Sequence, residues 1–261
     1  MSGVEISLQS IKNQLCENII RLFDCKHNEV FRGALNKFIY LVQSEFPTSA
    51  ELANRARFCF NNAYQITPEK IINEPDKFIL HWLESEYQLF RYFENDRYKD
   101  RIKAPFSTVE EIVIFANTIL NRRKSRAGKS LEHHLEEIFH LSTLQYQSQA
   151  ITEDNKRPDF LFPDSISYHA PGFNKENLIC LAAKTTCKDR WRQILNEADK
   201  IKFKHLFTTQ QGISSNQLRE MYKYNVILIV PEPYKKSFPA EYRSRILSLD
   251  QFVNFVKSKQ F

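Results

Sequence analysis

The chain has 261 residues, of which 42% are hydrophobic and 26% are charged. This composition is ordinary for a folded domain and excludes an intrinsically disordered chain. Glycine occurs five times, and neither a P-loop nor a dinucleotide-binding glycine motif is present, which argues against a nucleotide-binding fold.

The cysteines and the hydropathy of the chain indicate its compartment. Five cysteines are scattered without a CxxC pair, so neither a disulfide framework nor a structural zinc site is expected. No apolar run approaches the length of a transmembrane helix, and the first ten residues, MSGVEISLQS, lack the layout of a signal peptide. We therefore expect a cytoplasmic protein that has no membrane partner.

The first part of the chain, residues 5–88, is predicted to be helical. Apolar residues recur at the i, i+3, i+4 and i+7 spacing of a helix face in IKNQLCENIIRLFDC (11–25) and FRGALNKFIYLVQSEF (31–46). A further helix over 109–120 is indicated by Thr108 and Glu111, which have the spacing of a capping box. After a basic segment, the periodicity of SLEHHLEEIF (130–139) predicts another amphipathic helix.

Later in the chain, short β-rich runs alternate with helices. The predicted strands are PDFLF (158–162), LICLAAK (178–184), KHLFTT (204–209) and NVILIVP (225–231). Helices are expected from Trp191 and from Ser215, and the Ser248 and Gln251 spacing predicts the start of a last helix. This alternation predicts an α/β core.

The net charge of +6 is modest, but the cations are clustered. Residues 121–130, NRRKSRAGKS, contain no acid and five cations, and a second basic cluster runs over 184–204. Because cations set against phosphates release condensed counterions, both clusters favour a polyanionic partner. The alternative is a solvated surface that has no partner.

Residues suited to phosphodiester hydrolysis lie at two predicted strand ends. The reaction needs groups that bind a divalent metal, orient a water molecule and place positive charge near the transition-state oxygens. Asp159 opens one strand and Lys184 ends the next, so both are expected at one edge of the sheet. Nucleases of the PD-(D/E)XK type carry an acid two residues before the lysine, but that residue is Ala182 here. The second acid must therefore come from elsewhere.

The helix predicted from Trp191 offers Glu197 as that acid. Arg190 and Glu197 fall on one polar stripe, so the carboxylate can reach back over the end of the strand that carries Lys184. The alternative is an ordinary surface carboxylate that pairs with Lys200 or Arg190.

The turn formed by Lys188, Asp189 and Arg190 can read bases. Lysine and arginine donate to guanine O6 and N7, and aspartate accepts from cytosine N4, so these residues suit a G·C-rich half-site in the major groove. The alternative is a helix cap at Asp189 flanked by two solvated cations.

Three stretches, NRRKSRAGKSLE (121–132), QAITEDNKRPDFLFP (149–163) and KTTCKDRWRQILNEADKI (184–201), carry a family resemblance. The chain from about residue 86 to 239 resembles the catalytic domain of the EcoRII-type type II restriction endonucleases, bacterial enzymes of the PD-(D/E)XK superfamily with a permuted active site. The resemblance implies an endonuclease domain over 86–261, with a central mixed sheet flanked by helices. Residues 1–85 would then form an N-terminal helical region.

The resemblance also implies the roles of individual residues. Asp159, Lys184 and Glu197 would be catalytic, with Asp159 and Glu197 binding Mg²⁺. Glu132 would be an auxiliary acid, and Tyr168 would be a further site residue. The cations Arg122, Arg123, Lys124, Arg126 and Lys129 are assigned to contacts with DNA phosphates.

The implied substrate is double-stranded DNA with the sequence 5′-CCWGG, cut before the first cytosine, with the central pair flipped out. A palindromic site needs one reading surface for each half, so we expect a homodimer. Trp82, Tyr87 or Arg91 could stack on a flipped base, although each can also be a core or surface residue. Two alternatives stay open: a related CCNGG-type or repair nuclease of the same fold, and a non-catalytic DNA-binding protein.

Overall fold

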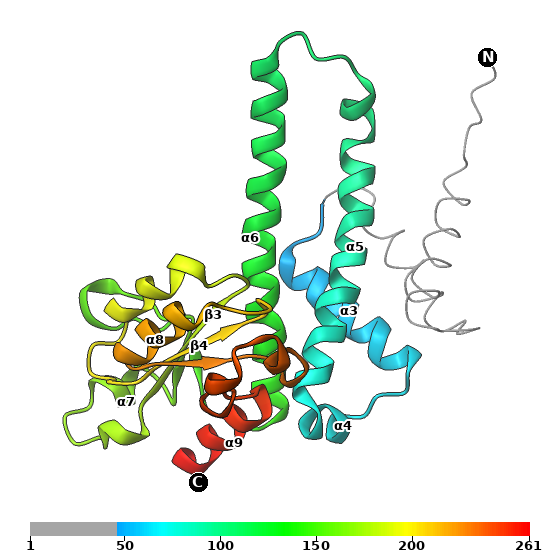
Figure 1. The fold of residues 1–261 in the computed structure, drawn as a ribbon. Coiled ribbons are helices and arrows are strands. Elements are labelled where there is room, and N and C mark those ends of the chain that lie inside the picture. The colour runs from blue at the N-terminus through cyan, green and yellow to red at the C-terminus, as the bar shows by residue number, and fades with distance from the viewer. Residues whose placement is uncertain (1–45) are drawn as a thin grey trace. The chain divides into compact units, whose positions relative to one another are not determined.

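A computed structural model describes residues 46–261 (Figure 1). The helix predicted over 11–25, and nearly all of the one predicted over 31–46, lie outside the described residues. The described residues form two compact units: residues 46–67 with His81–Arg126, and Pro68–Leu80 with Ala127–Phe261. Helices α5 (Pro75–Lys103) and α6 (Val109–Leu141) each contribute to both units. A domain boundary between residues 85 and 86 stays a prediction.

The described part of the first unit is helical. Helix α3 (Ser49–Ala63) begins with a capping box, in which the Thr48 hydroxyl accepts from Glu51 N at 3.2 Å and the Glu51 carboxylate accepts from Thr48 N at 2.8 Å. Its apolar face contributes Leu52 and Phe60 to a core that also contains Trp82 of α5. Amphipathic periodicity and a cap therefore account for this helical unit.

Helix α6 is one helix of 33 residues, where the sequence analysis predicted two separate helices over 109–120 and 130–139. Its start is as predicted, because the Thr108 hydroxyl accepts from Glu111 N at 3.2 Å. The intervening basic segment is helical because arginine and lysine are good helix formers. Gly128 lies within this segment, and a Cβ built there would meet no atom within 4 Å, so alanine would fit and glycine costs the helix about 1 kcal/mol relative to it.

The second unit contains a mixed five-stranded sheet with the order β1-β2-β3-β4-β5. Strands β1 to β3 pair antiparallel, whereas β3, β4 and β5 pair parallel. The sheet and its flanking helices confirm the predicted fold class. The strands are β1 (Gln147–Ser148), β2 (Phe160–Phe162), β3 (Ile179–Lys184), β4 (Lys204–Thr208) and β5 (Val226–Ile229).

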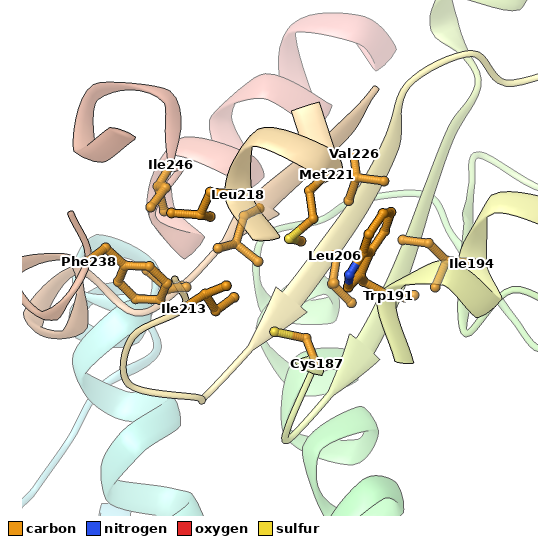
Figure 2. Packing of buried hydrophobic residues seen from close by; sticks show 13 residues of the cluster. Cys187, Trp191, Ile194, Leu206, Ile213, Leu218, Met221, Val226, Phe238 and Ile246 are labelled. Carbon is orange, nitrogen blue, oxygen red and sulfur yellow. The ribbon is translucent and has the colours of Figure 1, made fainter. Parts of the chain in front are cut away.

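One face of the sheet is covered by η3 (Lys188–Asn196) and α8 (Ser215–Lys223). Figure 2 shows Trp191 and Ile194 of η3, together with Met221 of α8, gathered with Leu206 of β4 in one apolar cluster. The η3 segment is a 3₁₀ helix that ends at Asn196, where the sequence analysis predicted a helix continuing through Glu197. Burial of both Trp191 and Ile194 positions this tighter helix on the strands.

The opposite face is packed by α6 and α9 (Leu249–Gln260) through aromatic rings. Phe139 of α6 lies 5.3 Å from Phe162, and Phe252 of α9 lies 5.8 Å from Phe162, as ring centroids. Helix α9 starts with the predicted capping box. The remaining elements are α4 (Pro68–Asn73), η1 (Glu153–Asn155), α7 (Ser165–His169), η2 (Lys175–Asn177), η4 (Glu232–Ser237) and η5 (Ala240–Arg245).

Across residues 46–261, no helix is both long enough and apolar enough to cross a bilayer.

Candidate active site

Asp159 and Lys184 meet at one edge of the sheet. Asp159 precedes β2 directly, and Lys184 is the last residue of β3, so antiparallel pairing of these strands places the two side chains together. The Lys184 Nζ atom donates to Asp159 Oδ2 at 2.7 Å, and the backbone N–H of Ala183 donates to the same oxygen at 2.8 Å. These contacts orient the carboxylate of Asp159, whose side chain is 11% exposed.

Glu197 joins this pair from the far end of η3. Its backbone is extended, with φ −92° and ψ 139°, because the 3₁₀ helix has just ended. Burial and the neighbouring charge of Asp159 raise the pKa of Glu197 to about 7, although the ammonium groups of Lys184 and Lys204 oppose this rise. The structure thus brings together the acid, the lysine and the displaced second acid.

Glu132 of α6 is the third carboxylate in this region. The side-chain amide of Gln149 lies between the two acids, with Nε2 at 3.4 Å from Asp159 Oδ1 and 3.5 Å from Glu132 Oε2. Burial, with the charge of Asp159, raises the pKa of Glu132 above its ordinary value, whereas Lys184 acts in the opposite direction. Sequence reasoning missed Gln149, because a glutamine beside a two-residue strand carries no recognisable motif.

The donor set suits a hard divalent cation. Carboxylate oxygens are the ligands that Mg²⁺ prefers, and Mg²⁺ is commonly bound by one or two carboxylates together with substrate phosphate. Within residues 46–261, no three acid, histidine or cysteine side chains are already arranged as a ligand set. Asp159 and Glu197 therefore supply two carboxylates that could hold such a cation, and Glu132 supplies further negative charge nearby.

Tyr168 lies behind the segment that follows Glu197. Its hydroxyl donates to the Glu153 carboxylate at 2.5 Å and accepts from the backbone N–H of Lys200 at 3.1 Å. Burial and the neighbouring Glu153 raise the pKa of the phenol above its ordinary value. Glu153 also accepts from Asp199 N at 3.1 Å. Tyr168 and Glu153 together therefore fix the backbone of residues 199–200 by hydrogen bonds.

The predicted recognition turn opens η3. Lys188 and Arg190 are exposed, whereas the side chain of Asp189 lies outside the described part of the structure. Cys187 is buried beneath the turn, and burial raises the pKa of its thiol to about 11, as expected for a packing residue. Gln210, which no sequence signal indicated, accepts from Cys187 N at 2.9 Å and thereby anchors the turn to the loop after β4.

Two arginines of the basic segment are engaged within the first unit. Arg123 forms a bidentate pair with Glu94 at 2.7 and 2.5 Å. Arg126 donates to Glu86 at 2.9 Å and lies over the Phe90 ring, with its guanidinium carbon 4.4 Å from the centroid. Both acids are almost fully buried, so these pairs contribute to the structure of the unit. Phosphate contacts by the two arginines stay a prediction.

The other three cations of this segment differ in their surroundings. Arg122 donates to the Tyr98 hydroxyl and lies 5.6 Å from the centroid of that ring. Lys124 and Lys129 are exposed, which is the environment that a phosphate contact requires. These two lysines therefore match the predicted role best.

The residues considered for stacking on a flipped base also have distinct environments. Trp82 is fully buried and its Nε1 donates to Asn61 Oδ1 at 3.0 Å, so it is a core residue. Tyr87 is 39% exposed, and its hydroxyl accepts from Arg91 Nη1 at 3.3 Å. Of the three candidates, Tyr87 and Arg91 thus remain compatible with a stacking role.

Comparison with known proteins places this geometry in a family. The model of the EcoRII C-terminal family matches residues 90–253. The type II restriction enzyme EcoRII of Escherichia coli is 50% identical over 181 residues, which cover 69% of this chain and 45% of that protein. The type II restriction enzyme SsoII of Shigella sonnei is 23% identical over 240 residues, covering 81% and 77% of the two chains. This chain thus spans about half the length of EcoRII.

Solved structures share the fold. Metal-depleted Ecl18kI in complex with uncleaved, modified DNA has a TM-score of 0.65 at 22% identity, covering 86% of this chain and 83% of that one. The complex of the restriction endonuclease PspGI with substrate DNA has a TM-score of 0.66 at 13% identity, covering 82% and 93%. The family model covers well over half of the residues, among them Asp159, Lys184 and Glu197, and the chain therefore belongs to the EcoRII C-terminal family.

Proposed function

We propose that this chain is a type II restriction endonuclease that hydrolyses double-stranded DNA with Mg²⁺ in the bacterial cytoplasm. Its target is a short palindrome, 5′-CCWGG, cut before the first cytosine with the central base pair flipped out. The observation that carries the proposal is the Asp159–Lys184 pair, at 2.7 Å, next to a second carboxylate, that of Glu197, whose pKa is raised by burial and by the charge of Asp159. Relatives named as type II restriction enzymes support the same reaction class.

The residues of the site have complementary roles in this reaction. Asp159 and Glu197 would hold the Mg²⁺, and the chemistry that the ion would supply there is Lewis-acid stabilisation of the charge that develops on the phosphate. Lys184 keeps its ammonium at the edge of the sheet, where it stabilises the negative charge that develops on the phosphate oxygens. Glu132 adds negative charge that favours cation binding, and Tyr168 holds the backbone that follows Glu197.

Base reading is assigned to Lys188, Asp189 and Arg190. The first two residues after Cys187 begin η3, and the same segment leads to Glu197, so recognition and catalysis share one chain segment. Correct base contacts can thereby position the scissile phosphate, because geometric alignment of reactants is a large part of catalysis. A palindromic target requires two copies of this surface, and we propose a homodimer.

The test is incubation of plasmid DNA with the wild-type chain and with Asp159→Ala in the presence of Mg²⁺. Discrete fragments from the wild type alone are expected, and sequencing of the fragment ends should give 5′-CCWGG. If the fragment ends instead show cleavage at CCNGG, the proposed target sequence is wrong but the proposed reaction, DNA hydrolysis, is correct. Retardation of DNA by both proteins without cleavage would refute the nuclease and leave the non-catalytic DNA-binding protein.

A further inference from the structure

Lys204 is a buried lysine whose ammonium group lies under the turn that carries Glu197. It is the first residue of β4 and is only 5% exposed. In the parallel register Lys204 pairs with Cys180 and Thr208 pairs with Lys184, so the side chains of Lys204 and Lys184 lie on the same face of the sheet. The two lysines therefore approach Glu197 from neighbouring strands.

The ammonium group is bound to the backbone of the turn. Lys204 Nζ donates to the carbonyl oxygen of Glu197 and, at 2.5 Å, to that of Ala198. Hydrogen bonds from a charged donor are about twice as strong as those between neutral groups. The lysine thus holds two successive carbonyl groups in one orientation.

This turn needs such support because its backbone conformation is unfavourable. Ala198 has φ +50°, in the left-handed region, which is unfavourable for a residue with a Cβ. Its side chain is fully buried against the sheet. Ala198 follows the extended backbone of Glu197 directly, and its carbonyl also accepts from Ile201 N at 2.9 Å across the turn at residues 199–200.

Building on the function proposed above, we propose that Lys204 is a positioning residue that sets the location of the Glu197 carboxylate for metal binding by clamping the Glu197 and Ala198 carbonyls. A buried cation is costly to desolvate, and an apolar side chain would fill this place at lower cost. The role proposed here explains why a lysine occupies this position, because its N–H groups hold the backbone that carries Glu197. Among the three acids of the site, Glu197 comes from a turn, whereas Asp159 precedes a strand and Glu132 lies on a helix.

The experiment compares Lys204→Met with the wild-type full chain by the affinity for Mn²⁺, measured by calorimetry, and by hydrogen exchange of the amides in residues 197–201. Loss of an interaction that orients a metal ligand typically lowers affinity about 10- to 100-fold, and this loss is expected together with faster exchange in the turn. Lys202→Met is the matched control, because Lys202 is exposed in the same segment, and it should leave both measurements unchanged.

A double-mutant cycle separates positioning from a general structural role. In the Glu197→Gln background, Lys204→Met should cause little further loss of Mn²⁺ affinity, since the residue through which it acts is already changed. If Lys204→Met lowers yield, Lys204→Gln keeps amide donors and should retain the fold with a smaller effect on the same two measurements. Equal losses of affinity in both backgrounds would overturn the proposal.

The outcome is distinguishable from failure of the proposed function. If the wild type neither cuts DNA nor binds Mn²⁺, the nuclease proposal fails, while the exchange measurement still tests the clamp. If the wild type binds Mn²⁺ and Lys204→Met binds it equally well, or if exchange over residues 197–201 is unchanged, Lys204 does not position Glu197.

Discussion

Glu197 is expected to destabilise the metal-free protein at neutral and alkaline pH. Its pKa rises from the ordinary 4.5 to about 7, chiefly because the carboxylate is buried and secondly because it faces the charge of Asp159. Glu197→Gln removes the charge while nearly preserving the shape of the side chain. This substitution should therefore increase the free energy of unfolding when no divalent metal is present.

The size and sign of the effect follow from linkage between protonation and folding. A carboxyl group with a raised pKa in the folded state binds its proton more tightly there, so its ionisation lowers stability. The difference between 4.5 and about 7 corresponds to at most about 3 kcal/mol, at about 1.4 kcal/mol for each pH unit. This cost is absent below pH 4.5, grows as the pH rises, and is complete above about pH 7.

Urea unfolding in EDTA, at several pH values from 4 to 8, measures this difference directly. Glu197→Gln should exceed the wild type by about 2–3 kcal/mol at pH 8, and the two should converge as the pH falls to 4. Adding Mg²⁺ should stabilise the wild type and not the variant, because a ligand that binds the folded state raises its stability. Equal stability at pH 8, or a difference independent of pH, would refute the reasoning.

Two further substitutions test the supports of the site and of the fold. Gln210→Ala removes the acceptor for Cys187 N and so loosens the turn of Lys188, Asp189 and Arg190. It should reduce the ratio of specific to non-specific DNA affinity, measured by fluorescence anisotropy, with little change in melting temperature. An unchanged ratio would contradict this role of Gln210. Asp76→Ala should destabilise the protein by about 2–4 kcal/mol in urea unfolding, because the carboxylate accepts from the backbone N–H groups of Leu249 at 2.8 Å and of Asp250 at 3.0 Å at the start of α9. Asn254→Ala on the exposed face of α9 is the control and should change stability little. If Asp76→Ala destabilises the protein no more than this control does, the hydrogen bonds from the start of α9 to Asp76 do not stabilise the fold.

The regular elements were largely predictable, because their signals are local. Four short β-rich runs coincide with β2 to β5 within two residues at each end, and the Ser248 capping box marks the start of α9. The two-residue β1 has no such pattern, since pairing with β2 alone defines it. The sequence analysis also missed that α6 is continuous. The polar segment 121–130 and its Gly128 resemble a loop between two helices when only the local sequence is considered.

By itself, the sequence determined that Asp159 and Lys184 share an edge, since residues at the ends of adjacent strands meet wherever those strands pair. Only the tertiary structure decided how Glu197 arrives there, because a 3₁₀ helix and a left-handed Ala198 replace the predicted helix, and the buried Lys204 holds them. It also decided that Arg123 and Arg126 meet buried acids on α5, 29 and 40 residues away in the chain. Spacing predicts contacts within an element or between adjacent strands, whereas packing of distant segments selects the partners of buried charges.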